Sequence, residues 1–203
     1  MSSPLQLSYR SKVCLPFTRN DKSIVIASLD SQVQPLHVPL PNGGSAFWLD
    51  SRTVAHVVET GEDKDKNLEL LALSIDFKPD AGVLDTVAAP VSVGTFPTLT
   101  ATNFRYSLAS GYLVFSDYVY ADGSLSSVKE KDEEWENRGT TALVFDSGYP
   151  RHWDHWLGPK KSALFSVRLA KTGDGTWELS NEFIYPLAYT RHASPRPSVS
   201  KMF

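Results

Sequence analysis

The chain has 203 residues, of which 41% are apolar and 21% are charged, and its formal net charge is −3. These values are ordinary for a soluble globular protein of one domain or two small ones. The slight acidity argues against a nucleic-acid binder, which usually carries a strongly basic face, and no stretch approaches the roughly 20 consecutive apolar residues of a membrane helix. The one cysteine, Cys14, excludes a disulfide within the chain and a cysteine-rich zinc site.

The sequence carries no sign of export. Its first residues, Met1–Leu5, lack a basic segment followed by an apolar run. There is also no Asn-x-Ser/Thr acceptor for N-glycosylation. The compartment stays open, with the cytosol as the default expectation.

Apolar residues alternate with a period of two along most of the chain, which predicts β-strands. In chain order, the expected strands lie around 24–26, 33–40, 54–58, 68–75, 112–120 and 163–169. Polar turns such as Asp50–Arg52, Asp122–Gly123 and Gly173–Gly175 separate them. Strand, short turn and strand in succession predict antiparallel hairpins.

One segment, Ser124–Arg138, departs from this pattern because it is rich in charge. Its large apolar residues, Leu125, Val128 and Trp135, fall close to one helical face. The segment therefore predicts a short surface helix near 125–138, ending at Gly139 as the C′ glycine. Beyond residue 190, apolar periodicity is lost and prolines and serines predominate, so we expect 191–203 to be an extended or disordered tail.

A weak internal repeat suggests how the strands are organised. Phe17–Ile26 and Phe47–His56 share an aromatic residue, a polar turn, a cation, a hydroxyl residue and a strand, at an offset of 30 residues. Such repetition predicts a stack of small antiparallel sheets, so the expected fold is all-β, a partial β-propeller over residues 1–190. A sandwich of the same strands is the alternative that periodicity does not separate.

Two polar groups are candidates for chemistry. One candidate metal site consists of His152, Asp154 and His155. On a single strand, however, the side chain of His155 would point away from the other two. The simpler interpretation is that the aromatic neighbours pack between strands and that these polar side chains form hydrogen bonds with the backbone. Glu133 and Glu134 could together bind the ammonium group of a peptide, or form a solvated helix face. Gly-x-Ser-x-Gly and Gly-rich phosphate-binding motifs are absent from the sequence, and no cofactor is expected.

Several segments resemble one known family. They are Trp48–Val58, Asp122–Leu125, Trp135–Asp146, Arg151–Trp156 and Gly158–Lys160. These segments look like fungal dipeptidyl-peptidase V enzymes, within the prolyl oligopeptidase family of serine peptidases. The similarity extends from about Ser11 to Pro195, and the Trp-Glu-Asn-Arg-Gly and Arg-His-Trp-Asp strings are its more specific parts.

The resemblance implies an N-terminal β-propeller followed by an α/β-hydrolase domain that carries a Ser-Asp-His triad. Only the propeller is matched, so no triad residue carries over, and the hydrolase domain is expected to be absent from residues 1–203. The family cleaves dipeptides from peptide N-termini, and its propeller caps the active site and limits access. We therefore expect a non-catalytic propeller portion, inactive alone, in which Glu133 and Glu134 contact peptide substrates in the full-length context.

Two alternatives remain at this stage. A truncated propeller could act as a module that binds a peptide, a protein or a second copy through exposed sheet edges. A metal-dependent hydrolase built on His152, Asp154 and His155 is the other alternative.

Overall fold

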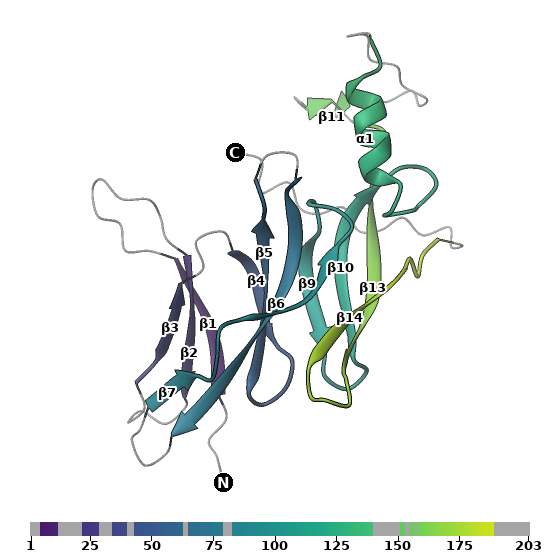
Figure 1. Cartoon of the computed structure of the whole chain (residues 1–203). Helices are drawn as coiled ribbons and strands as arrows, with labels where there is room; N and C mark the ends of the chain where they lie inside the picture. Colours follow the sequence, from purple (N-terminus) through teal and green to yellow (C-terminus); the bar gives the residue numbers. More distant parts are fainter. Residues whose placement is uncertain are drawn as a thin grey trace, which may run out of the picture.

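The computed structural model describes residues 5–11, 22–28, 34–39, 43–62, 65–78, 83–139, 151–152, 155–156 and 158–188. In these segments the strands form three stacked antiparallel sheets and a short hairpin (Figure 1). The first sheet is a meander of β1 (Leu5–Ser11), β2 (Lys22–Ser28) and β3 (Leu36–Pro39). Adjacent strands in sequence therefore pair with each other, as the turn signals predict.

The middle sheet contains five strands, and its central strand β6 is long enough to serve two partners. It comprises β4 (Gly43–Trp48), β5 (Thr53–Thr60), β6 (Asn67–Lys78), β7 (Val83–Thr86) and β8 (Val91–Phe96). Along one side β6 pairs with β5, and along the other it pairs with β8 near its start and with β7 near its end.

The third sheet has the strand order β14-β13-β10-β9. Its strands are β9 (Thr102–Ser107), β10 (Tyr112–Val119), β13 (Lys161–Lys171) and β14 (Trp177–Ile184). In β10 and β13 buried and half-buried residues alternate, so one face of this sheet lies in the core.

The middle sheet is covered on both faces, which explains why five consecutive residues of β5, Thr53 to Val57, are buried. On one face Val54 and Leu73 pack against Ile24 of the first sheet. On the other face Ala55 and Val57 belong to a larger apolar layer shared with the third sheet, which is rich in aromatic rings. Phe115 lies at its centre and contacts four other rings, those of Phe96, Phe104, Phe165 and Phe183.

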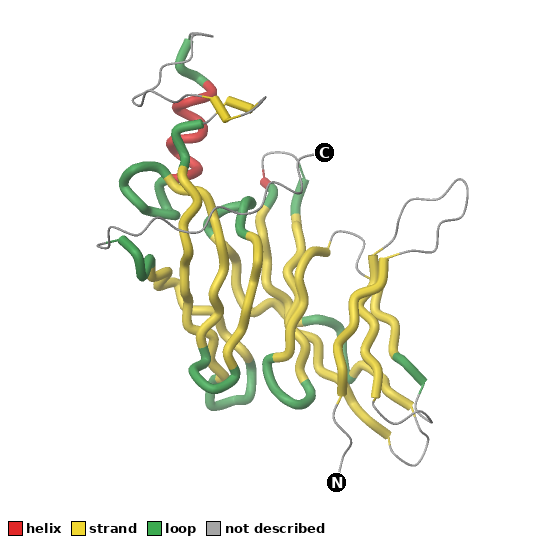
Figure 2. The backbone as a smooth tube through the Cα atoms, turned by 180° about the vertical axis from the view of Figure 1, so that it is seen from behind, coloured by secondary structure: helices red, strands yellow, loops and turns green. Residues whose placement is uncertain are grey.

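Face-to-face stacking of three small sheets confirms the predicted all-β, partial propeller-like fold (Figure 2). A two-sheet sandwich, the alternative from the sequence, covers only one face of each sheet. The repeat is also reflected in the structure. Ile24, in its first copy, lies on β2, the second strand of the first sheet, and Val54, at the equivalent place in the second copy, lies on β5, the second strand of the middle sheet. Phe17, the aromatic residue of the first copy, lies outside the described residues.

The helix α1 (Val128–Glu136) forms where the charged segment predicts it. Val128 and the preceding Leu125 are buried, while the acidic face is exposed. The C-cap is Asn137, so Gly139 lies one position beyond the expected C′ site, with a positive φ of 67°. The prediction of the helix is confirmed, and its end was misplaced by one residue because both Asn137 and Gly139 are residues that favour helix ends.

The sequence did not lead us to expect strands β1, β4, β7, β8, β9, β11 (Arg151–His152), β12 (His155–Trp156) and β14. β9 and β14 contain many polar residues, and the pairing of both strands is interrupted by a register shift. A shift of this kind breaks the period-two pattern on which strand prediction depends. The described part of the chain contains no helix long and apolar enough to cross a membrane. Cys14 and the 191–203 tail lie outside the described residues.

Candidate functional site

Helix α1 is inserted between β10 and β13 and stands above the end of the third sheet (Figure 1). Two polar clusters fix it there. In the first, Lys131 Nζ lies 2.6 Å from Asp122 Oδ2, and Ser127 Oγ donates a hydrogen bond of 2.7 Å to the same oxygen. These two donors lower the pKa of Asp122 to about 2, so that its carboxylate stays charged in mild acid.

The second cluster joins the helix to both flanking strands. Tyr120 Oη donates to Asp132 Oδ1 at 2.8 Å, and Lys160 Nζ lies 2.8 Å from the same carboxylate. Burial, followed by the hydrogen bond to Asp132, raises the pKa of Tyr120 to about 12. Tyr120 therefore remains a neutral donor at physiological pH. The ammonium groups of Lys131 and Lys160 lie 5.6 and 5.9 Å from the Tyr120 ring centroid, which adds a cation–π contribution.

The two predicted binding residues, Glu133 and Glu134, are exposed neighbours on this anchored helix. Successive side chains on an α-helix diverge by about 100°, so the two carboxylates do not point in the same direction. The negative charge of Glu134 is one of the smaller causes that raise the pKa of Tyr120. The structure thus places two acids on an anchored, solvent-facing element, and their role in binding stays a prediction.

A hollow of about 440 Å³ lies beside the first cluster, between the β10–α1 turn and the end of β14. Its wall combines the carboxylates Asp122 and Glu182 with the apolar or aromatic side chains of Phe183, Ile184 and Tyr185. Sequence reasoning missed this hollow because β14 was not predicted. Acidic groups beside apolar surface suit a ligand that carries a cationic group next to an apolar side chain, such as the N-terminal residue of a peptide.

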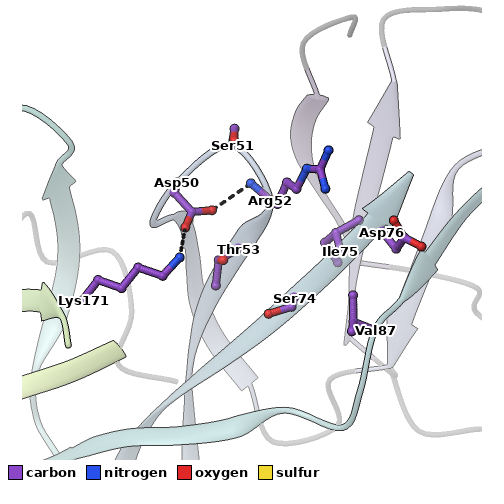
Figure 3. A pocket seen from close by; sticks show the side chains of 9 residues that line it. All are labelled: Asp50, Ser51, Arg52, Thr53, Ser74, Ile75, Asp76, Val87 and Lys171. Atoms are coloured by element: carbon purple, nitrogen blue, oxygen red, sulfur yellow. Dashed lines mark hydrogen bonds and ion pairs between the residues drawn. The ribbon is translucent and has the colours of Figure 1, made fainter. Parts of the chain in front are cut away.

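A second hollow, of about 380 Å³, lies where the middle and third sheets meet (Figure 3). Asp50 occupies the turn between β4 and β5, where one of its oxygens accepts the backbone N–H of Arg52 at 2.8 Å. Its other oxygen lies 3.3 Å from Lys171 Nζ at the end of β13. Burial acts against ionisation, but the hydrogen bonds from Arg52, Thr53 and Lys171 outweigh it and lower the pKa of Asp50. The pair links two sheets, so its role is structural.

The possible metal site is described only in part. His152 and His155 occupy paired positions in the hairpin of β11 (Arg151–His152) and β12 (His155–Trp156), while Asp154 lies outside the described residues. The two histidines therefore lie on separate antiparallel strands, unlike the single strand considered from the sequence. Within the residues that the structure describes, no group of three or more His, Cys, Asp or Glu side chains is placed to hold a metal ion.

Comparison with known proteins supports the fold and leaves the activity open. No family model matches the chain, and no curated protein matches it in sequence. Among solved structures it is similar to the acylaminoacyl peptidase of Pyrococcus horikoshii, with a TM-score of 0.51 and 9% sequence identity. The match covers 91% of this chain but only 24% of that chain, so this chain spans about a quarter of the length of the peptidase. At this identity the similarity concerns the fold.

Proposed function

We propose that the chain is the propeller portion of a serine exopeptidase of the prolyl oligopeptidase family, and that it contributes to substrate access and binding. The observation that carries the proposal is the structural similarity to part of an acylaminoacyl peptidase, which belongs to that family. The sequence resemblance to dipeptidyl-peptidase V, found independently of the structure, favours release of dipeptides from peptide N-termini as the activity of the complete enzyme.

In this proposal the nucleophile, the base and the oxyanion donors come from a separate α/β-hydrolase domain, because acyl transfer requires them in one site. The stacked sheets would restrict entry to short, extended peptides. The anchored helix α1 would present Glu133 and Glu134 to the peptide, with one of the two diverging carboxylates at its ammonium group, and the hollow beside Asp122 would receive the adjoining side chain.

The first experiment tests catalysis by the purified chain. It is incubated with a dipeptidyl chromogenic substrate and, separately, with a serine-reactive phosphonate. We expect neither release of the chromophore nor covalent labelling. Turnover abolished by the phosphonate would contradict the proposed non-catalytic role.

The second experiment tests substrate binding. Isothermal titration of the chain with a tripeptide that has a free N-terminus is compared with the same tripeptide N-acetylated, which lacks the ammonium charge. We expect binding of the free peptide only, weakened at least about tenfold by E133Q/E134Q, which corresponds to loss of one or two charge-assisted hydrogen bonds. Glu130→Gln is the matched control, since it removes an exposed acid from the same helix. Equal affinity for both peptides would exclude the ammonium role.

A second candidate function is a module that binds a protein, or a second copy of the chain, by strand addition. The order of the third sheet leaves β9 and β14 at its two edges, where extended chains can add as further strands. Size-exclusion chromatography with light scattering tests self-association, and a monomer at micromolar concentration would remove the second-copy version of this candidate.

A further inference from the structure

The apolar layer between the first and middle sheets contains a buried histidine, His56. His56 lies in the middle of β5, paired with Ala46 of β4 and Leu71 of β6. Its neighbours along the strand on the same face, Val54 and Val58, pack in the layer that also contains Ile24. The imidazole is therefore enclosed in an apolar environment, where its exposed fraction is 2%.

The ring nitrogen Nδ1 of His56 is buried and has no hydrogen-bond partner. A neutral imidazole has one nitrogen that donates and one that only accepts, so a bare Nδ1 fits the neutral ring. Protonation would place an N–H on this atom and a positive charge in the layer. Both are costly without an acceptor or a counter-charge, and burial accordingly lowers the pKa of His56.

Among the side chains that the structure describes, the charged groups around this layer do not offer compensation. On β6, Glu69 lies on the same face two positions from Leu71, and its carboxylate accepts a hydrogen bond from Ser92 on the adjacent β8. It makes no charge contribution to the pKa of His56, for which burial is the cause. The other positions of the layer that the structure describes are apolar: Ile24, Ile26, Leu36, Val38, Ala46, Trp48, Val54, Val58, Leu73, Ile75 and Leu84.

We propose that His56 makes the contact between the first and middle sheets pH-sensitive, so that its protonation releases the first sheet while the other two sheets stay packed. The two apolar layers differ in size. Six buried residues of the described chain form the layer that contains His56, against nineteen in the layer between the middle and third sheets. On the described residues, the layer that contains His56 therefore opens at lower cost, because hydrophobic stabilisation scales with the apolar area buried.

The direction of the effect follows from linkage. In the released state His56 is hydrated and has its ordinary pKa of 6.5, whereas in the packed state its pKa is lower. The packed state is therefore most stable above pH 6.5 and loses stability as the pH falls from 6.5 towards the lowered pKa. In that window the equilibrium constant for opening rises up to about tenfold for each pH unit.

Amide hydrogen exchange followed by mass spectrometry tests this on the whole chain. Protection of the β2 segment, Lys22–Ser28, is measured between pH 7.5 and pH 5 and corrected for the intrinsic exchange rate. We expect protection of β2 to fall over this range, by up to about tenfold for each pH unit below 6.5, while protection of β10 is retained. In His56→Leu, which keeps an apolar side chain at this position, the fall should disappear. His37→Gln should behave like the unsubstituted chain, because His37 lies exposed on the outward-facing side of β3.

Unchanged protection of β2, a fall that persists in His56→Leu, or an equal fall in β10 would each overturn the proposal. If His56→Leu does not fold, the proposal is tested on the unsubstituted chain by nuclear magnetic resonance. The imidazole Cε1 resonance of His56 is then titrated, and a midpoint at or above 6.5 would overturn the proposal as well.

Discussion

Replacing Gly94 by alanine tests whether the middle and third sheets are packed as closely as the structure shows. Gly94 lies on β8 at a register shift in its pairing with β6, and faces Leu179 of β14. A Cβ atom placed on Gly94 would lie 2.7 Å from Leu179 Cβ, far inside van der Waals contact. The φ angle of 156° adds a second penalty, because L residues rarely adopt it.

The magnitude follows from these two terms. Inserting a methyl group into a well-packed core costs about 1–3 kcal/mol, and an unfavourable backbone conformation costs about 1–3 kcal/mol more. Gly94→Ala should therefore lower the free energy of unfolding by roughly 2–6 kcal/mol, out of the 5–15 kcal/mol typical of a domain. Urea unfolding followed by circular dichroism measures the change.

Two matched glycines separate the contributions. At Gly139 the φ angle is also positive, at 67°, but a Cβ would meet nothing within 4 Å, so Gly139→Ala carries only the backbone cost. At Gly158 a Cβ would also meet nothing, and no positive φ is present, so Gly158→Ala should be nearly neutral. Truncation of Leu179 to alanine should not rescue Gly94→Ala, because the clashing Cβ remains. A change of less than about 0.5 kcal/mol in Gly94→Ala would refute the close packing.

Three further predictions concern the aromatic core and the anchoring of α1. Phe115→Ala should destabilise the chain by about 3–5 kcal/mol, since the ring is fully buried, and urea unfolding measures it. The carboxyl resonance of Asp122 should titrate near pH 2, and in Lys131→Met its midpoint should move towards 3.8. The stability that this pair contributes is present above pH 3.8 and is lost as the pH falls through about 2. Asp132→Asn should lower the pKa of Tyr120 below 12 in a spectrophotometric titration, and an unchanged value would show that Asp132 does not contribute.

Much of the fold could be predicted because it depends on short-range patterns. In β10 and β13, alternation places Leu113, Phe115, Phe165 and Val167 on one face whatever the partner sheet, so these strands were identified correctly. The strands that were missed depend on their neighbours. β14 pairs with β13 through a register shift, and Phe183 at its end packs against Phe115, which no local pattern of apolar residues indicates.

The candidate site shows the same division. The sequence identified the acidic segment with Glu133 and Glu134, but the hollow beside Asp122 requires β14 to lie next to the β10–α1 turn. Likewise, the alternation in β5 predicts that the His56 side chain lies on an apolar face of the strand. Only the stacking of the first sheet on that face shows that the Nδ1 atom of His56 lacks a hydrogen-bond partner.

The sequence by itself determined that this chain forms antiparallel strands with one charged helix, because strand alternation and helix-end signals act between residues a few positions apart. The tertiary structure decided that the strands form three stacked sheets, which residues share each apolar layer, and that Asp50 meets Lys171 from 121 residues away. Those contacts depend on how whole sheets bury their apolar faces against one another, a choice that many alternating sequences leave open.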